Sequence, residues 1–250
     1  MKKAGVFTIE FIDIYQAMRF DIIWNYRELF LRGVSLTLRL TLIGYGLGLI
    51  FGVILGLGRL SKRKIFYYPS KIYIDFFRGT PLLVQILIIH TALIPSIFGQ
   101  SLGYFVSGAL ALTLNSAAYI AEIVRAGIQS LDKGQSEAAR SLGMPEGMAM
   151  RFVILPQAIR RMVPPLGNEL IALLKDSSLV TVIAATDILY AAKVVQGATF
   201  RQWEPYLTAA LLYLILTWVA TKLITYIENR FSTSYVPKKQ SKSFFNMFRR

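Results

Sequence analysis

The chain has 250 residues, of which 54% are hydrophobic and 17% are charged, and its formal net charge is +14. Soluble domains carry about 25% charged residues, so this composition disfavours a soluble globular protein and favours a membrane protein. A basic excess is also typical of nucleic-acid-binding proteins, but no base-stacking module or basic recognition helix is evident, so no nucleic-acid partner is expected. The absence of cysteine excludes a disulfide framework, a thiolate nucleophile and a cysteine-ligated metal site.

The first 30 residues differ in charge pattern from the segment that follows. Residues 1–30 lack a compact apolar core before a cleavage site, so no signal peptide is expected. Residues 8–30 could lie along the membrane interface as an amphipathic helix, or could form an ordinary surface segment. Residues 40–58 carry no charge and predict a first membrane span. Its glycines include small residues at four-residue spacing, which favours close packing against another helix in lipid: Gly44, Gly46, Gly48, Gly52, Gly56 and Gly58.

The remaining spans follow from longer uncharged runs. Residues 79–121 carry no charge and are too many for one span of about 20 residues, so Pro95, Gly99 and Gln100 are expected to divide them. The fourth span is the least clear by hydropathy because it contains Glu169, Lys175 and Asp176. The sequence therefore predicts an all-α integral membrane protein with five transmembrane helices. These cover about 31–58, 70–94, 104–130, 162–184 and 205–227.

The distribution of basic residues predicts the orientation. Lys and Arg are concentrated in residues 59–71, in the loop 131–161 and in the tail, whereas 95–103 and 185–204 carry few. The positive-inside rule then places the carboxyl end in the cytoplasm and the amino end outside, although basic residues near the amino end oppose this assignment. The expected regions are an outward-facing segment 1–30, a transmembrane domain 31–231 and a basic cytoplasmic tail 232–250.

The loop between the third and fourth spans contains the most informative motif, EAARSLGMPEGMAMRFVILP, over residues 137–156. A short helix with adjacent alanines, Ala138 and Ala139, could approach a groove in another protein closely. Gly143 suits the left-handed turn that ends such a helix, and Pro145 suits the first turn of a second helix. A Glu-Ala-Ala triplet alone would favour an ordinary helix-turn-helix connection between two membrane spans.

With that spacing, the motif resembles the loop that permease subunits of ATP-binding-cassette (ABC) importers present to their ATPase. The matching positions are Glu137, Ala138, Ala139, Gly143 and Pro156. The segments FRGTPLLVQ (77–85), AAYIAEIVRAGIQSLDKGQSEAA (117–139), LPQA (155–158) and GNELIALLKDSSL (167–179) are similar to the polar amino-acid branch, which includes the histidine, glutamine and arginine importers.

This resemblance implies a type I transmembrane subunit in the bacterial cell membrane. It further implies a second permease copy, identical or related, together with two ATPase subunits, an extracytoplasmic solute-binding protein and a polar amino acid as cargo. The chain has no GxxxxGK[ST] phosphate-binding loop, so ATP and Mg²⁺ are expected in the partner ATPase rather than in this chain.

Polar residues within the spans are candidates for the solute path, because ionisable groups at membrane depth are costly unless they face a cavity or a partner. Asn115, Tyr119 and Glu122 share one helical face. Glu122 or Glu169 could bind a substrate ammonium group, and donors near the Arg78-Gly79-Thr80 break could bind a carboxylate. The full candidate set is Thr80, Gln85, Asn115, Tyr119, Glu122, Asn168 and Glu169.

Other interpretations remain open at this point. Glu122 could instead pair with Arg125, and Glu169, Lys175 and Asp176 could hold two permease copies together. His90 is expected to be packed or pore-lining rather than a ligand. No catalytic triad or clustered metal ligands are evident. The alternative functions are an ATPase-independent channel or secondary transporter, or an ABC importer of another small solute.

Overall fold

The computed structural model describes residues 19–231, and the regular structure in this part of the chain is helical. Two long helices form its centre, α3 (Arg27–Leu60) and α7 (Gly103–Gln129). The other membrane-embedded elements are α4 (Lys64–Gly79), α5 (Leu82–Ile88), η1 (Ile89–Leu93), α6 (Ile94–Phe98), α10 (Leu155–Asp176), η3 (Ser177–Ile183), α11 (Ile188–Thr199) and α12 (Trp203–Phe231). The remaining elements are α2 (Asp21–Asn25), α8 (Lys133–Ser141), α9 (Glu146–Ala149) and η2 (Met150–Ile154).

The face of α3 that carries Gly44, Gly48, Gly52 and Gly56, here called the glycine face, lies against α7 and lets the two central helices approach closely. A methyl group added at Gly52 would lie 2.7 Å from Ile120 Cβ, and one at Gly44 would lie 2.9 Å from Leu112 Cβ. Gly48 and Gly56 meet Ser116 and Val124 in the same way. The packing predicted from the four-residue spacing is therefore confirmed.

Within residues 19–231, three helices are long and apolar enough to cross a membrane, namely α3, α7 and α12, and the total is five if each of two bent pairs forms one span. The segments Lys64–Gly79 and Leu82–Phe98 meet at 107°, and Glu146–Ile183 and Ile188–Thr199 meet at 47°. The predicted helix over 70–94 is therefore wrong as a single straight span. Pro81 lacks a backbone N–H and disfavours helical geometry in the preceding residue, so the chain turns there.

The boundaries of other elements also differ from the sequence predictions. α3 begins at Arg27, before the expected start at 31, and α10 begins at Leu155, before the expected start at 162. Helix α11 was not predicted as a separate element. Asp187 begins it by accepting hydrogen bonds from the N–H groups of Leu189 and Tyr190. The interpretations of residues 8–18 and of the tail 232–250 fall outside the described residues.

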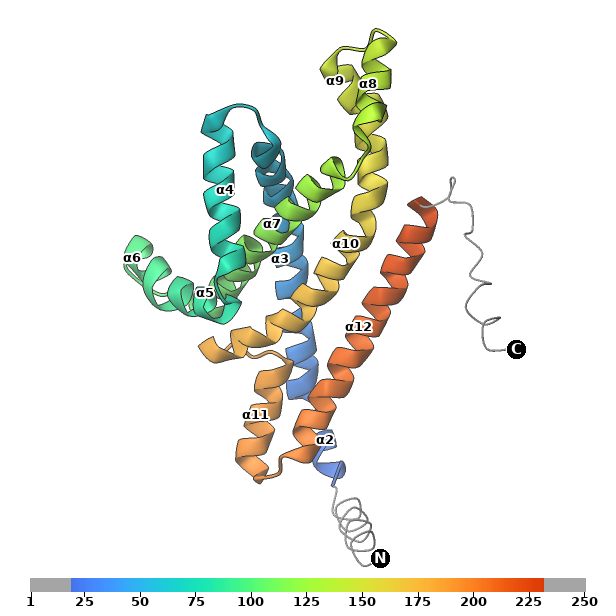
Figure 1. The fold of residues 1–250 in the computed structure, drawn as a ribbon. Helices are drawn as coiled ribbons and strands as arrows, with labels where there is room; N and C mark the ends of the chain where they lie inside the picture. The colour runs from blue at the N-terminus through green and yellow to red at the C-terminus, as the bar shows by residue number, and fades with distance from the viewer. Residues whose placement is uncertain (1–18, 232–250) are drawn as a thin grey trace, which may run out of the picture.

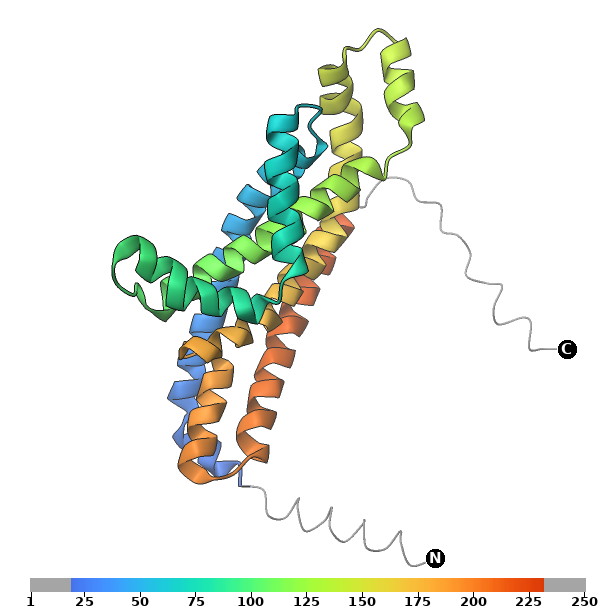
Figure 2. The same cartoon turned by 60° about the vertical axis from the view of Figure 1, so that its left-hand side comes forward.

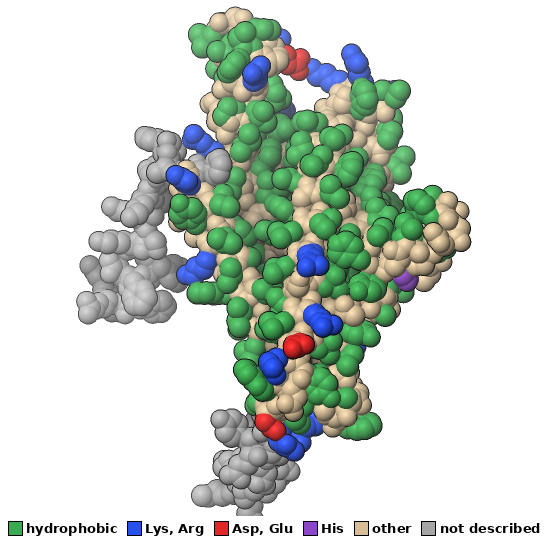
Figure 3. Space-filling model, turned by 180° about the vertical axis from the view of Figure 1, so that it is seen from behind, with side chains coloured by type: hydrophobic (Ala, Val, Ile, Leu, Met, Phe, Trp, Pro, Cys, Tyr) green, Lys and Arg blue, Asp and Glu red, His purple; other side chains and the backbone are tan. Residues whose placement is uncertain are grey.

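The two ends of the molecule carry different elements. α2 and the α11–α12 connection lie at one end, whereas α8 and α9 project from the other, where α3 also ends (Figures 1 and 2). Hydrophobic side chains cover most of the face shown in Figure 3, with Lys and Arg near its upper edge and in its lower half. The basic 59–71 and 131–161 segments thus share one end, as the charge pattern requires.

Candidate solute path and coupling loop

The bend after α4 is held by side chains from the predicted path. Gln85 is buried, and its Nε2 donates to Phe77 O at 2.9 Å, to Thr80 O at 3.0 Å and to Thr80 Oγ1 at 2.8 Å. Gln85 Oε1 accepts from Asn115 Nδ2 at 2.9 Å, which links the bend to α7. Because α4 ends at Gly79, these bonds satisfy carbonyls that a continuous helix would have satisfied itself. Thr80, Gln85 and Asn115 therefore lie together at the bend.

A second cluster lies farther along α7 and is strongly charged. Arg125 donates to both carboxylate oxygens of Glu122, with its Nε at 2.9 Å and its Nη2 at 2.5 Å. Arg78 Nη1 lies 3.8 Å from Glu122, and the Arg78 guanidinium carbon lies 5.5 Å from the centre of the Tyr119 ring. The pairing of Glu122 with Arg125, considered from the sequence, is thus present. A substrate ammonium group would have to compete with two arginines here.

Glu169 has a different environment from Glu122. It is half-buried on α10, near Ser116 and Tyr45, and it forms no ion pair with any residue between 19 and 231. The Tyr45 hydroxyl donates to Leu166 O at 3.1 Å, which ties α3 to α10 beside it. The neighbouring Asn168 is exposed. Of the two candidate carboxylates, Glu169 is therefore the one without a cationic partner in the described chain.

A hollow of about 320 Å³ lies between α7 and α10. Its walls include Glu122 and Arg161, whose charges are opposite, together with Ser130. Arg161 also donates to the Ser130 carbonyl. The hollow therefore has an acidic and a basic residue in its walls, but the carboxylate of Glu122 is already bound by Arg125.

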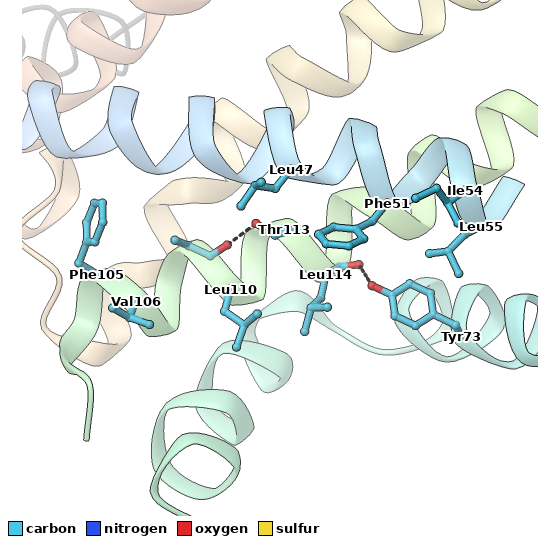
Figure 4. A pocket seen from close by; sticks show the side chains of 11 residues that line it. Leu47, Phe51, Ile54, Leu55, Tyr73, Phe105, Val106, Leu110, Thr113 and Leu114 are labelled. Carbon is cyan, nitrogen blue, oxygen red and sulfur yellow. Dashed lines mark hydrogen bonds between the residues drawn. The ribbon is translucent and has the colours of Figure 1, made fainter. Parts of the chain in front are cut away.

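A groove of about 550 Å³ is chemically different from this hollow (Figure 4). It lies between α3, α4 and α7 and is lined mainly by aliphatic and aromatic side chains such as Leu47, Phe51 and Leu110. Its hydroxyl groups are already bonded to the backbone. Tyr73 donates to Leu114 O at 2.8 Å, and Thr113 donates to Ala109 O at 2.7 Å. The groove therefore offers no free polar group for an amino acid.

The loop between α7 and α10 has the turn that its sequence predicts. The Asp132 side chain accepts from Gly134 N at 2.8 Å and begins α8, and Gly143 ends the turn after it with φ +84°. The Gly143 N–H donates to Arg140 O, and Met144 N–H donates to Ala139 O. Pro145 directly precedes α9. The left-handed conformation predicted for Gly143 is confirmed.

The exposure of the loop shows which side chains are available for contact. Glu137 and Ala138 are exposed, whereas Ala139 is buried against the loop, so only one of the two alanines lies on the surface. Pro156 lies in the first turn of α10 and joins the loop to the membrane domain. The loop also exposes apolar side chains at a polar end of the molecule: Leu142, Met148, Met150 and Phe152. Such a patch is typical of a protein contact.

Sequence reasoning missed two long-range features. Lys62 forms an ion pair with Glu146 of α9 at 2.8 Å, although 84 residues separate them. Asp187 is buried and accepts from Thr181 at 2.5 Å and from the Tyr213 hydroxyl at 3.2 Å. An acidic residue before an apolar run is a helix-start signal that could have located Asp187, but no local signal identifies the ion pair. His90 is partly buried, with its Nδ1 2.9 Å from Ser107 Oγ.

Comparison with known families gives one match over most of the chain. Residues 48–233 match the model of the binding-protein-dependent transport system inner membrane component. The arginine transport system permease protein of Bacillus subtilis (strain 168) is 39% identical over 204 residues, covering 82% of this chain and 93% of that protein. A putative glutamine transport system permease protein of Rickettsia bellii (strain RML369-C) is 38% identical, covering 81% and 92%.

Solved structures agree with this fold. A crystal structure of an amino acid ABC transporter with histidines has 43% sequence identity and a TM-score of 0.80, covering 86% of this chain and 99% of that one. A methionine ABC transporter in inward-facing conformations gives a TM-score of 0.71 at 22% identity, covering 86% and 100%, which supports the fold alone.

Proposed function

The chain belongs to the family of binding-protein-dependent transport system inner membrane components, and we propose on this basis that it is the permease subunit of an ATP-driven importer of polar amino acids. The members of this family are membrane-spanning transport subunits rather than catalytic domains. Relatives named for arginine and glutamine transport support a polar amino acid as the cargo. The solved amino acid transporter at 43% identity supports the same class.

The observation that carries this proposal is the projecting α8–α9 loop. The loop projects from one end of the helical bundle (Figure 2). It combines a left-handed turn at Gly143, a surface alanine at Ala138 and exposed apolar side chains. A small residue allows close approach of a partner, and the apolar side chains supply contact area. In the proposed function, this loop docks on the ATPase and transmits its movement to the membrane helices.

Replacing Gly143 by Val tests this role. A β-branched residue in the left-handed conformation costs about 1–2 kcal/mol at that position and turns α9 away from its present direction. We expect membrane insertion to persist while co-purification with the ATPase, or amino-acid-stimulated ATP hydrolysis, falls severalfold. Gly147 of the same loop lacks a positive φ and has open space around it, so Gly147→Val is the matched control. Normal assembly and transport in Gly143→Val would mean that the loop only connects α7 to α10 and has no coupling role.

The same proposal defines the partners. ATP and Mg²⁺ bind in two ATPase subunits, a second permease copy completes the membrane domain, and an extracytoplasmic protein delivers the solute. The carboxyl end and the α8–α9 loop face the cytoplasm, and the amino end faces outside. The clustering of basic residues at the end that carries α8 and α9 supports this orientation.

The proposed solute path runs beside the two carboxylates. Glu169 attracts the substrate ammonium group or a cationic side chain, since it has no cationic partner in the described chain. Glu122 also lines a hollow with Arg161, but its pairing with Arg125 leaves Glu169 as the carboxylate available to the substrate. Thr80, Gln85 and Asn115 hold the bend that shapes the path. Tyr119 and Asn168 are exposed polar residues of the same proposed path.

A channel or secondary transporter is the alternative from another class. Such a protein would transport without an ATPase, so purification with a bound ATPase distinguishes the two functions directly. Within the importer class, the cargo is identified by the amino acid that stimulates ATP hydrolysis in the reconstituted complex.

A further inference from the structure

The last turn of α3 lies between the coupling loop and the charged cluster on α7. Directly after α3, Lys62 Nζ lies 2.8 Å from Glu146 Oε1, the first residue of α9. Both side chains are largely exposed, at 84% and 69%. An exposed pair of this kind contributes roughly 0–1 kcal/mol, so it links the two segments without fixing them rigidly in one position. It nevertheless joins the tip of the loop to the α3–α4 connection.

One helical turn before Lys62, Arg59 points into the protein. Its Nε and Nη1 are buried and have no hydrogen-bond acceptor within residues 19–231. The guanidinium carbon lies 4.8 Å from the centre of the Tyr67 ring of α4, a cation–π contact that does not satisfy the N–H groups. Buried donors without acceptors are costly, so this conformation leaves Arg59 poorly satisfied.

The end of α3 that carries Arg59 packs against the part of α7 that carries Glu122, since a methyl group at Gly56 would lie 2.9 Å from Val124 Cβ. Glu122 is held by Arg125 and approached by Arg78. A second arrangement, in which Arg59 replaces one of these two arginines, would give its buried N–H groups an acceptor.

We infer that Arg59 is a conformation-dependent partner of Glu122, and that the Lys62–Glu146 pair couples movement of the α8–α9 loop to the turn of α3 that carries Arg59. This inference rests on the proposed role of the loop in ATPase coupling. When the ATPase displaces α9, Glu146 draws Lys62 and the end of α3 with it. Arg59 then engages Glu122, and Arg78, at the bend beside the solute path, is released.

The first experiment tests the link between α9 and α3. Uptake per ATP hydrolysed is measured in proteoliposomes that contain the whole importer, for Lys62→Glu, Glu146→Lys and the double exchange. Each single variant should lower this ratio roughly two- to fivefold, as expected for loss of an exposed pair and introduction of a like-charge contact. The double exchange should restore most of it. Lys64→Glu is the matched control, because Lys64 is exposed nearby and has no ion-pair partner in the described part of the chain.

The second experiment tests the partner of Arg59. Arg59→Gln should lower uptake per ATP, Arg59→Lys should retain part of it, and Arg59→Gln combined with Glu122→Gln should be no worse than Glu122→Gln alone. Arg59 would only pack on Tyr67 if the losses of uptake per ATP in the two single variants multiplied in the double variant. The same conclusion would follow if Arg59→Gln lowered thermal stability but left uptake per ATP unchanged. The inference would also be overturned if the double exchange at 62 and 146 lowered uptake per ATP as much as the single variants do. If Gly143→Val uncouples transport but the Lys62 variants do not, the proposed function stands and only this inference fails.

Discussion

At the scale of single residues, two glutamates in the membrane domain have opposite electrostatic surroundings. Glu122 is bound by Arg125 and approached by Arg78, whereas Glu169 has no cationic partner between residues 19 and 231. A carboxylate that is already paired adds little attraction for a second cation. An unpaired carboxylate at membrane depth gains most from a cationic ligand, because burial without a partner is costly. The two residues should therefore respond differently to neutralisation.

Glu169→Gln tests this difference. If Glu169 binds the substrate ammonium group, uptake should fall about tenfold or more, since hydrogen bonds to charged groups contribute about 1.5–3 kcal/mol. ATP hydrolysis should continue, and detergent gel filtration should show an intact complex. Glu28→Gln, at an exposed site in the first turn of α3, is the control. Dissociation of the complex would instead assign Glu169 to the interface between copies. Unchanged uptake in both Glu169→Gln and Asn115→Ala would exclude solute contact at these positions.

At the scale of elements, the glycine face and the bend after α4 have complementary effects on the fold. The glycines bring α3 and α7 close together between Gly44 and Gly56. The bend redirects α5 and α6 away from α4, and the Gln85–Asn115 hydrogen bond attaches it to α7. Close packing needs only small residues, whereas the bend requires replacement hydrogen bonds in a region without water.

The glycine face predicts a difference between two conservative substitutions in α3. A methyl group at Gly52 would lie 2.7 Å from Ile120 Cβ and 2.9 Å from Ala117 O, so Gly52→Ala should separate the helices. Such overpacking typically costs about 1–3 kcal/mol, and we expect a lower midpoint of thermal unfolding in detergent. Gly46→Ala is the control, because a methyl group there has no neighbour within 4 Å. Equal midpoints for the two variants would contradict the close packing of α3 on α7.

At the scale of the whole molecule, the two ends predict opposite accessibility. Lys62 and Arg140 lie at the end with α8 and α9, and Phe200 lies at the opposite end, between α11 and α12 (Figure 1). The native chain has no cysteine, so single introduced cysteines report without background. Their reaction with a membrane-impermeant thiol reagent therefore reports which end faces the medium.

In intact cells, cysteine at position 200 should react with the reagent, and cysteine at 62 or 140 should react only after the membrane is permeabilised. Phe200 is 87% exposed, so steric protection does not explain a negative result there. Reaction at 62 and 140 but not at 200 would place the α8–α9 loop outside the cell. That result would rule out coupling to a cytoplasmic ATPase.

The sequence alone determined the features that depend on neighbouring residues. Uncharged runs indicated four of the five membrane-spanning regions, four-residue spacing located the face of α3 that packs on α7, and the position of Gly143 predicted a left-handed turn. These features follow from hydropathy, from helix periodicity and from the backbone preference of one residue, respectively. The same local information showed that Glu122 could reach Arg125, because they are three residues apart on one helix.

Tertiary structure decided the features that join distant segments. The 107° bend, the Gln85–Asn115 bond, the approach of Arg78 to Glu122 and the Lys62–Glu146 pair all depend on how separate helices are placed. Periodicity shows which face of a helix is apolar, but it does not show which helix packs against that face or which residues along the two helices are in contact. Glu122 and Glu169 are both acidic residues in apolar segments, so only the packing of α4, α7 and α10 could show that one is paired and the other is not.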